Sequence, residues 1–128
     1  MLMTATTKKS VDEVAERLPE ACTAHGFGVL GVHDLRAKLQ EKGQAWDTPC
    51  LVFDVCNPVQ AKRVLTAEPN ISAVLPCRIS AFPDEAGRTR LVTVRPTRMI
   101  ELFGADLQDV AREVEETLEA ILNDVAAG

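Results

Sequence analysis

Aromatic residues are scarce in this sequence, which has four Phe, one Trp and no Tyr among its 128 residues. Proteins that bind single-stranded nucleic acid stack the bases on aromatic rings, and this sequence has few aromatic side chains for such stacking. Basic residues are also in deficit, since 14 Lys and Arg stand against 19 Asp and Glu and give a net charge of −5. Nucleic acids are bound by basic surfaces. We therefore expect no nucleic-acid partner.

Long apolar runs are missing as well. No stretch approaches the ~20 apolar residues that a membrane helix needs, so we expect no membrane association. In residues 1–9 the lysines follow a short apolar run, which is the reverse of the order in a secretory signal. We therefore expect a cytoplasmic protein, in which cysteines remain reduced thiols. There are four of them: Cys22, Cys50, Cys56 and Cys77.

The common catalytic and cofactor motifs are absent from the sequence. No two cysteines form a Cys-x-x-Cys pair, which removes the usual zinc and thioredoxin spacings. There is no nucleophile elbow, phosphate loop, His-Glu-x-x-His or dinucleotide-binding glycine pattern. The sequence therefore assigns neither an enzyme class nor a cofactor.

The hydrophobic pattern predicts a single domain over residues 1–128. We expect strands over 2–7, 27–33, 51–56, 72–82 and 88–95, and helices over 11–25, 35–42, 58–68, 96–104 and 107–125. Ser10 and Glu13 form a capping box, Asn57 and Pro58 begin a helix, and Asp106 is placed to cap the longest helix. The order predicts an α+β fold: a single, largely antiparallel sheet covered on one face by two main helices, β-α-β(4)-α with short inserted helices.

Two prolines lie inside these predicted elements. Pro19 falls within the first helix, where we expect a kink because proline removes a backbone hydrogen bond. Pro76 falls within the predicted strand over 72–82, so that strand should lie at a sheet edge or contain a bulge. The other sheet face would carry Val52 and Cys56, and a partly apolar open face suggests a partner subunit or a ligand.

Several short motifs resemble those of one family. They are Gly26-Phe27-Gly28-Val29, His33-Asp34-Leu35, Cys56-Asn57-Pro58 with Ala61, and Leu75-Pro76-Cys77. In this order and on these elements, they are similar to the bacterial and archaeal family called domain of unknown function 302. The similarity covers nearly the whole chain. The resemblance implies a fold like that of the TATA-binding protein, a homodimer, and no established activity.

Cys56 is the strongest candidate for a reactive side chain. It ends a strand directly before the N-cap Asn57, where the positive end of a helix dipole can lower a thiol pKa. The alternative is a buried thiol that fills the corner between strand and helix, because free cysteine is among the most buried residue types.

Cys77 and His33 could join Cys56 in a redox pair or a soft-metal site. Alternating strand faces place the two cysteines on opposite sides of the sheet, so this pair requires a bulge at Pro76. Cys77 could instead be a core residue, and His33 a surface residue beside the helix cap Asp34.

Three readings of function follow, of which the third, beside the two described next, is a purely structural interaction module. The first is a small cytoplasmic domain, a homodimer that binds a small ligand or a partner through its sheet face, with candidate ligand-binding residues His33, Cys56, Asn57 and Cys77. The second is a thiol-based redox, metal-binding or haem-binding protein that uses Cys56 with Cys77 and possibly His33 as ligands.

Overall fold

The computed structural model, which describes residues 1–127, contains one five-stranded antiparallel sheet with helices packed on it. The strands are β1 (Leu2–Thr7), β2 (Gly28–Asp34), β3 (Leu51–Cys56), β4 (Cys77–Pro83) and β5 (Thr89–Val94). They lie in the order β1-β5-β4-β3-β2. The predicted α+β class is confirmed.

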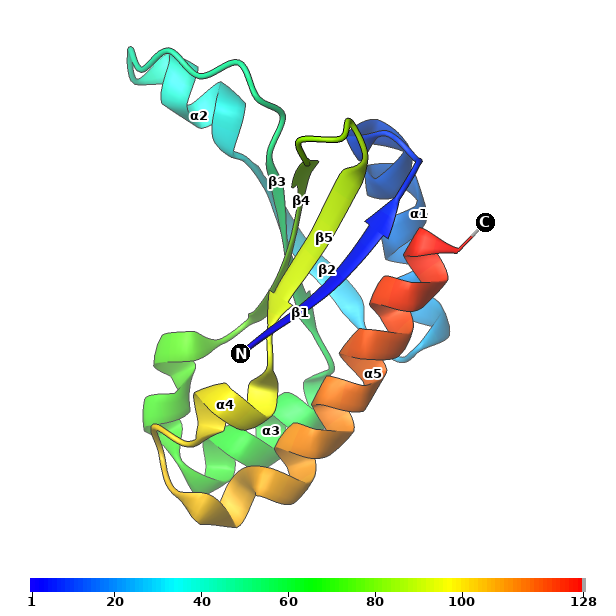
Figure 1. Cartoon of the computed structure of the whole chain (residues 1–128). Helices are drawn as coiled ribbons and strands as arrows, with labels where there is room; N and C mark the ends of the chain where they lie inside the picture. The colour runs from blue at the N-terminus through cyan, green and yellow to red at the C-terminus, as the bar shows by residue number, and fades with distance from the viewer. Residues whose placement is uncertain (128) are drawn as a thin grey trace.

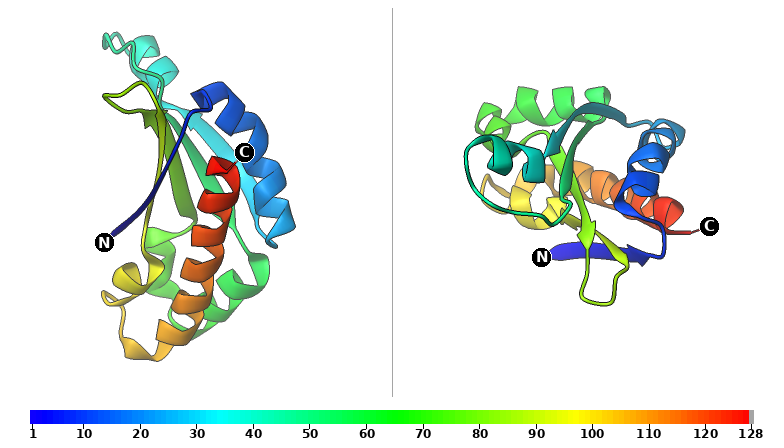
Figure 2. Two further views of the ribbon diagram at one scale, coloured as in Figure 1. Left: turned by 45° about the vertical axis from the view of Figure 1, so that its right-hand side comes forward. Right: turned by 90° about the horizontal axis from the view of Figure 1, so that it is seen from above.

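Two long helices, α1 (Val11–Ala24) and α5 (Gln108–Ala126), lie side by side on one face of the sheet (Figures 1 and 2). The main core fills the space between them and the strands. Its largest fully buried side chains include Leu18, Phe53, Ile79, Leu91 and Leu118. The buried stripe of α5 contributes Leu118, Ile121, Leu122 and Val125 to this core.

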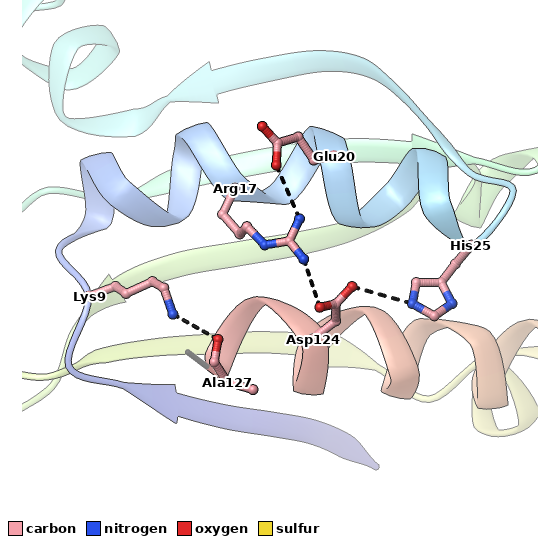
Figure 3. A network of polar contacts seen from close by, with 6 residues as sticks. All are labelled: Lys9, Arg17, Glu20, His25, Asp124 and Ala127. Atoms are coloured by element: carbon pink, nitrogen blue, oxygen red, sulfur yellow. Dashed lines mark hydrogen bonds and ion pairs between the residues drawn. The ribbon is translucent and has the colours of Figure 1, made fainter.

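Polar contacts also join α1 to α5 (Figure 3). Asp124 of α5 lies 2.7 Å from a guanidinium nitrogen of Arg17 and 3.5 Å from Nε2 of His25. Lys9 Nζ donates a hydrogen bond of 2.9 Å to the carbonyl oxygen of Ala127 at the end of α5. These contacts are partly exposed, so packing dominates the attachment of the two helices.

The short elements gather at opposite ends of the sheet (Figure 1). At one end lie α3 (Pro58–Ala67), the 3₁₀ helix η1 (Pro69–Val74) and α4 (Pro96–Ile100). At the other end, α2 (Leu35–Glu41) projects away from the body and has no buried residue. A second 3₁₀ helix, η2 (Ala105–Leu107), precedes α5. A second cluster of buried apolar residues, separate from the main core, lies at the end of the sheet that carries α3, η1 and α4. Its members are Val64, Ile71, Ile100, Val110 and Ala111.

Local signals place the starts of α1 and α3. Ser10 accepts a hydrogen bond from the Glu13 amide at 3.1 Å, and Glu13 accepts one from the Ser10 amide, so the predicted capping box is present. Asn57 caps α3 by accepting from the Gln60 amide at 3.1 Å, with Pro58 at the first helical position. Helix α1 runs on as one α-helix through Pro19.

Three expectations about element boundaries are wrong. Residues 72–76 are not strand, because η1 occupies the first part and the cis-bonded Leu75–Pro76 peptide follows it. β4 starts at Cys77, after the proline that cannot donate to the ladder, and it is a central strand rather than an edge. Asp106 does not cap α5; it lies in η2, and the N-cap position is Leu107, which makes no side-chain cap bond.

One irregularity was missed in β2. Its register against β3 shifts between Val29 and Gly31, which makes Leu30 an extra residue in the strand. Val29 pairs with Val55 of the helix-covered face, whereas Gly31 pairs with Asp54 of the open face. Val29 and Gly31, which strict alternation along the strand would place on one face, therefore lie on opposite faces.

Candidate functional site

A cavity of about 300 Å³, here called the end cavity, lies where β3 and β4 meet the helices at one end of the sheet. Its walls come from six parts of the chain, one of which is the start of β2 with Phe27 and Leu30. The walls also include Val55 and Cys56 of β3, Gln60, Ala61 and Val64 of α3, the η1–β4 segment 71–77, Met99 and Ile100 of α4, and Ala111 and Val114 of α5. Most of these side chains are apolar.

The elements that form the cavity are fixed by ordinary packing and capping. Asn57 turns the chain from β3 into α3, and its side-chain amide lies near the turn at Gly26, whose φ of +79° calls for glycine. Helix α4 is held against α5 by Glu115, whose carboxylate accepts hydrogen bonds from the Thr97 hydroxyl at 2.7 Å and the Thr97 amide at 3.2 Å. The same carboxylate pairs with Arg95 at 3.3 Å.

Both candidate cysteines line the end cavity. Cys77 belongs to the helix-covered face of β4, in register with the buried Val55. Cys56 has the opposite strand parity, but it is the last residue of β3, so its side chain still reaches the cavity. The structure therefore brings Cys56 and Cys77 to one site without a register shift between β3 and β4.

The thiols in this cavity favour their protonated form. Burial raises the pKa of Cys77 to about 11, and the neighbouring Cys56 contributes to this rise. Burial likewise raises the pKa of Cys56, in the direction opposite to the one expected from its place before a helix. A raised pKa reduces the thiolate fraction at neutral pH, which makes both thiols poor nucleophiles.

His33 lies elsewhere, on the open face of the sheet. It pairs with Val52, whereas Cys56 pairs with Gly28, so His33 and Cys56 are separated by on the order of 13 Å along the strands. His33 Nε2 lies 2.7 Å from Oδ2 of Asp54, and its Nδ1 lies 3.3 Å from Lys38 Nζ.

Asp54 is the centre of this polar group on the open face. Its side chain is 16% exposed, and Arg78 Nε approaches Oδ1 at 3.3 Å. That contact is an ion pair without hydrogen-bond geometry, because Oδ1 accepts no hydrogen bond. Among residues 1–127, no three His, Cys, Asp or Glu side chains are arranged to hold a metal ion.

A family model described as "Domain of unknown function DUF302" matches residues 3–125. The chain belongs to the DUF302 family. A search of curated proteins gives no match. The crystal structure of an uncharacterised conserved DUF302 protein from Bacillus stearothermophilus is 32% identical, with a TM-score of 0.91 over 97% of each chain. This DUF302 domain thus has a relative of closely similar shape, and the family description carries no activity.

Sequence reasoning found part of the end cavity of this DUF302 domain. It singled out Cys56, Asn57 and Cys77, and all three line the cavity. It missed Gln60 and Met99, which carry no motif and enter the site only because α3 and α4 fold against the same end of the sheet. Within residues 1–127, no helix is long and apolar enough to cross a membrane.

Proposed function

We propose that this DUF302 domain binds a small, largely apolar molecule in the end cavity. The observation that carries the proposal is the cavity itself: about 300 Å³ at the junction of a sheet end and three helices, with an almost wholly apolar lining. Ligand pockets in proteins have volumes of about 300 Å³ or more and are lined mainly by apolar side chains, with a few polar groups that orient the ligand. From the sequence we expected ligand binding on the open sheet face. We now propose the end cavity as the ligand site instead.

Filling the cavity tests the proposal. Ala61 lines it from α3, and Ala61→Leu adds three carbon atoms to that wall. The probe is a methoxynaphthalene, a neutral fluorescent bicyclic compound, titrated into the full chain. Overpacking of about 1–3 kcal/mol predicts binding weaker by about 5-fold to 150-fold in the variant.

The matched control is Ala67→Leu, at the exposed end of the same helix and outside the cavity lining. It should leave the affinity unchanged. Circular dichroism and the melting temperature of each variant show that it is folded. Equal affinities for the wild type and Ala61→Leu would mean that the probe binds elsewhere and would remove the proposal.

The proposal extends to a cytoplasmic homodimer that forms through the open sheet face. Apolar side chains occupy this face by strand register, among them Val52, Val92, Val94 and Leu2, and the last two are substantially exposed. Exposed apolar patches of this kind support a partner surface. All four cysteines are free, which supports a reducing compartment.

Native mass spectrometry and sedimentation test the dimer. Val92 pairs with Ser80 and Thr4 in the middle of the open face, so Val92→Glu should place a charge in the interface and yield monomer. Val59→Glu, an equal change at an exposed apolar residue of α3, should leave the dimer intact. A monomeric wild type at micromolar concentration would rule out the dimer.

The second candidate function is a thiol-based redox or metal site, which the meeting of Cys56 and Cys77 in one cavity favours. The raised pKa values of both thiols oppose it, and His33 lies too far from Cys56 to complete it. Metal analysis of anaerobically purified protein distinguishes the two functions: stoichiometric metal that Cys56→Ser removes would establish the thiol site.

A further inference from the structure

The side chain of Gln60 carries an unsatisfied acceptor at the wall of the end cavity. Gln60 lines the cavity from α3, and its Oε1 is shielded from solvent without a hydrogen-bond partner. Its Nε2 donates to Oε2 of Glu113 at 3.5 Å, and Arg63 donates to the same oxygen at 3.1 Å. A carboxylate only accepts, so it orients the amide with nitrogen toward Glu113 and oxygen away from it.

A buried acceptor without a donor costs free energy, and native proteins rarely leave one unpaired without a reason. Asn57, the other amide of the cavity wall, already uses its carbonyl oxygen to cap α3. Gln60 Oε1 is therefore the carboxamide oxygen of the described lining that is left without a donor; because water does not reach it in the free chain, the Gln60 side chain must turn toward the cavity, giving up its 3.5 Å contact with Glu113, for a bound molecule to donate to it.

The lining also restricts the charge of that molecule. Across the part of the chain that the structure describes, the cavity wall contains no carboxylate, ammonium, guanidinium or imidazole group. A charged ligand would lose its hydration without gaining an opposite charge, and this strongly disfavours binding. An uncharged donor, such as a hydroxyl or an amide N–H, satisfies Gln60 without that penalty.

We propose that the ligand of the end cavity is an uncharged molecule with an apolar body and one hydrogen-bond donor, which Gln60 Oε1 accepts. This inference rests on the proposed function and names the class of ligand. A dry apolar cavity of about 150 Å³ accommodates one benzene molecule. The end cavity, at about 300 Å³, therefore suits a body of about two fused rings or a chain of similar volume.

Three matched probes test the inference: a naphthol, its methyl ether and the corresponding naphthoate, titrated at pH 7 into the full chain. The naphthol offers a neutral donor, the ether lacks the donor, and the naphthoate carries a negative charge. The wild type should bind the naphthol about tenfold more tightly than the ether, which is the effect of one hydrogen bond. The naphthoate should bind more weakly than either.

The variant Gln60→Met keeps the length of the side chain and removes the acceptor. It should abolish the preference for the naphthol and leave the affinity for the ether within about twofold, since apolar contact is retained. Lys62→Met, at an exposed position on the same helix outside the lining, is the matched control and should keep the preference.

The outcomes separate this inference from the proposed function. If none of the probes binds the wild type, the proposed function itself is wrong. If the ether and the naphthol bind equally, or if Gln60→Met weakens both alike, the cavity binds ligands but Gln60 does not select a donor. Naphthoate binding as tight as naphthol binding would refute the argument from charge.

Discussion

Glu115 offers a test of what holds the end cavity together. Its carboxylate lies on α5, is 15% exposed, and joins that helix to the first turn of α4 through two hydrogen bonds from Thr97 and an ion pair with Arg95. Hydrogen bonds to a charged group contribute about 1.5–3 kcal/mol each, and such bonds within one network are not additive. We expect Glu115→Ala to lower the free energy of unfolding by about 2–4 kcal/mol. The melting temperature should fall by roughly 10 °C.

The pH dependence makes this prediction specific. Burial tends to raise the pKa of Glu115, but the hydrogen bonds from the Thr97 side chain and amide, together with Arg95, hold it below the ordinary value of 4.5. A carboxyl whose folded pKa is lowered contributes stability that is present above its unfolded pKa and lost as the pH falls through its folded pKa. The difference between wild type and variant should therefore be larger at pH 7 than at about pH 3.

Urea unfolding at several pH values measures both effects. The control is Glu116→Ala, which removes an exposed carboxylate from the adjacent position of the same helix. This control should change the stability by less than about 0.5 kcal/mol. A Glu115→Ala variant as stable as the control, or one with the same deficit at both pH values, would refute the assigned role of this network.

Three further predictions concern the core, a helix cap and a thiol. Leu118→Ala should cost about 2–5 kcal/mol in urea unfolding because the side chain is fully buried; a loss below 1 kcal/mol would show that the site collapses to fill the gap. Ser10→Ala should cost about 1 kcal/mol by removing the capping box with Glu13, whereas Lys8→Ala at an exposed position should cost almost nothing. Alkylation of Cys77, followed by peptide mass spectrometry, should accelerate with pH up to about 11; a plateau near pH 9 would contradict its raised pKa.

The fold was predictable where the local signals are strong. The capping box at Ser10 and the helix start at Asn57 each specify structure within a few residues, and both are present. The strand over 51–56 was also predicted correctly, because the alternate burial of residues such as Phe53 and Val55 is a direct consequence of the pleat.

The errors have physical causes that a single sequence does not reveal. Residues 72–76 are apolar enough for a strand, but 72–74 belong to the 3₁₀ helix η1, and Val74 and Leu75 pack against the second apolar cluster. The bulge at Leu30 leaves no sequence signature, and it reverses the faces of the residues on its two sides. Asp106 has the chemistry of a cap, but η2 intervenes and places Leu107 at the N-cap position.

For the candidate site too, residues marked by a local sequence signal were predictable, whereas those brought together by tertiary structure were not. Cys56 and Asn57 were recognisable because they mark the junction of a strand and a helix, a local feature. The meeting of Cys56 with Cys77 depends on the register of β3 against β4 and on Cys56 being the last residue of its strand, which are tertiary facts. Gln60 could not be identified at all, since its significance comes from the absence of a partner for one oxygen atom.

The volume of the end cavity is the main support for the proposal that this site is functional. Empty apolar volume costs on the order of 24 cal/mol per Å³ in engineered cavities, and about 300 Å³ would cost up to about 7 kcal/mol if it were closed and empty. Native domains have only about 5–15 kcal/mol of stability, and larger side chains at a few lining positions could recover some of this loss. Small residues such as Ala61 and Ala111 nevertheless line the cavity. A bound ligand would fill the volume and stabilise the folded chain by mass action, so the same residues that weaken the free protein would serve the complex.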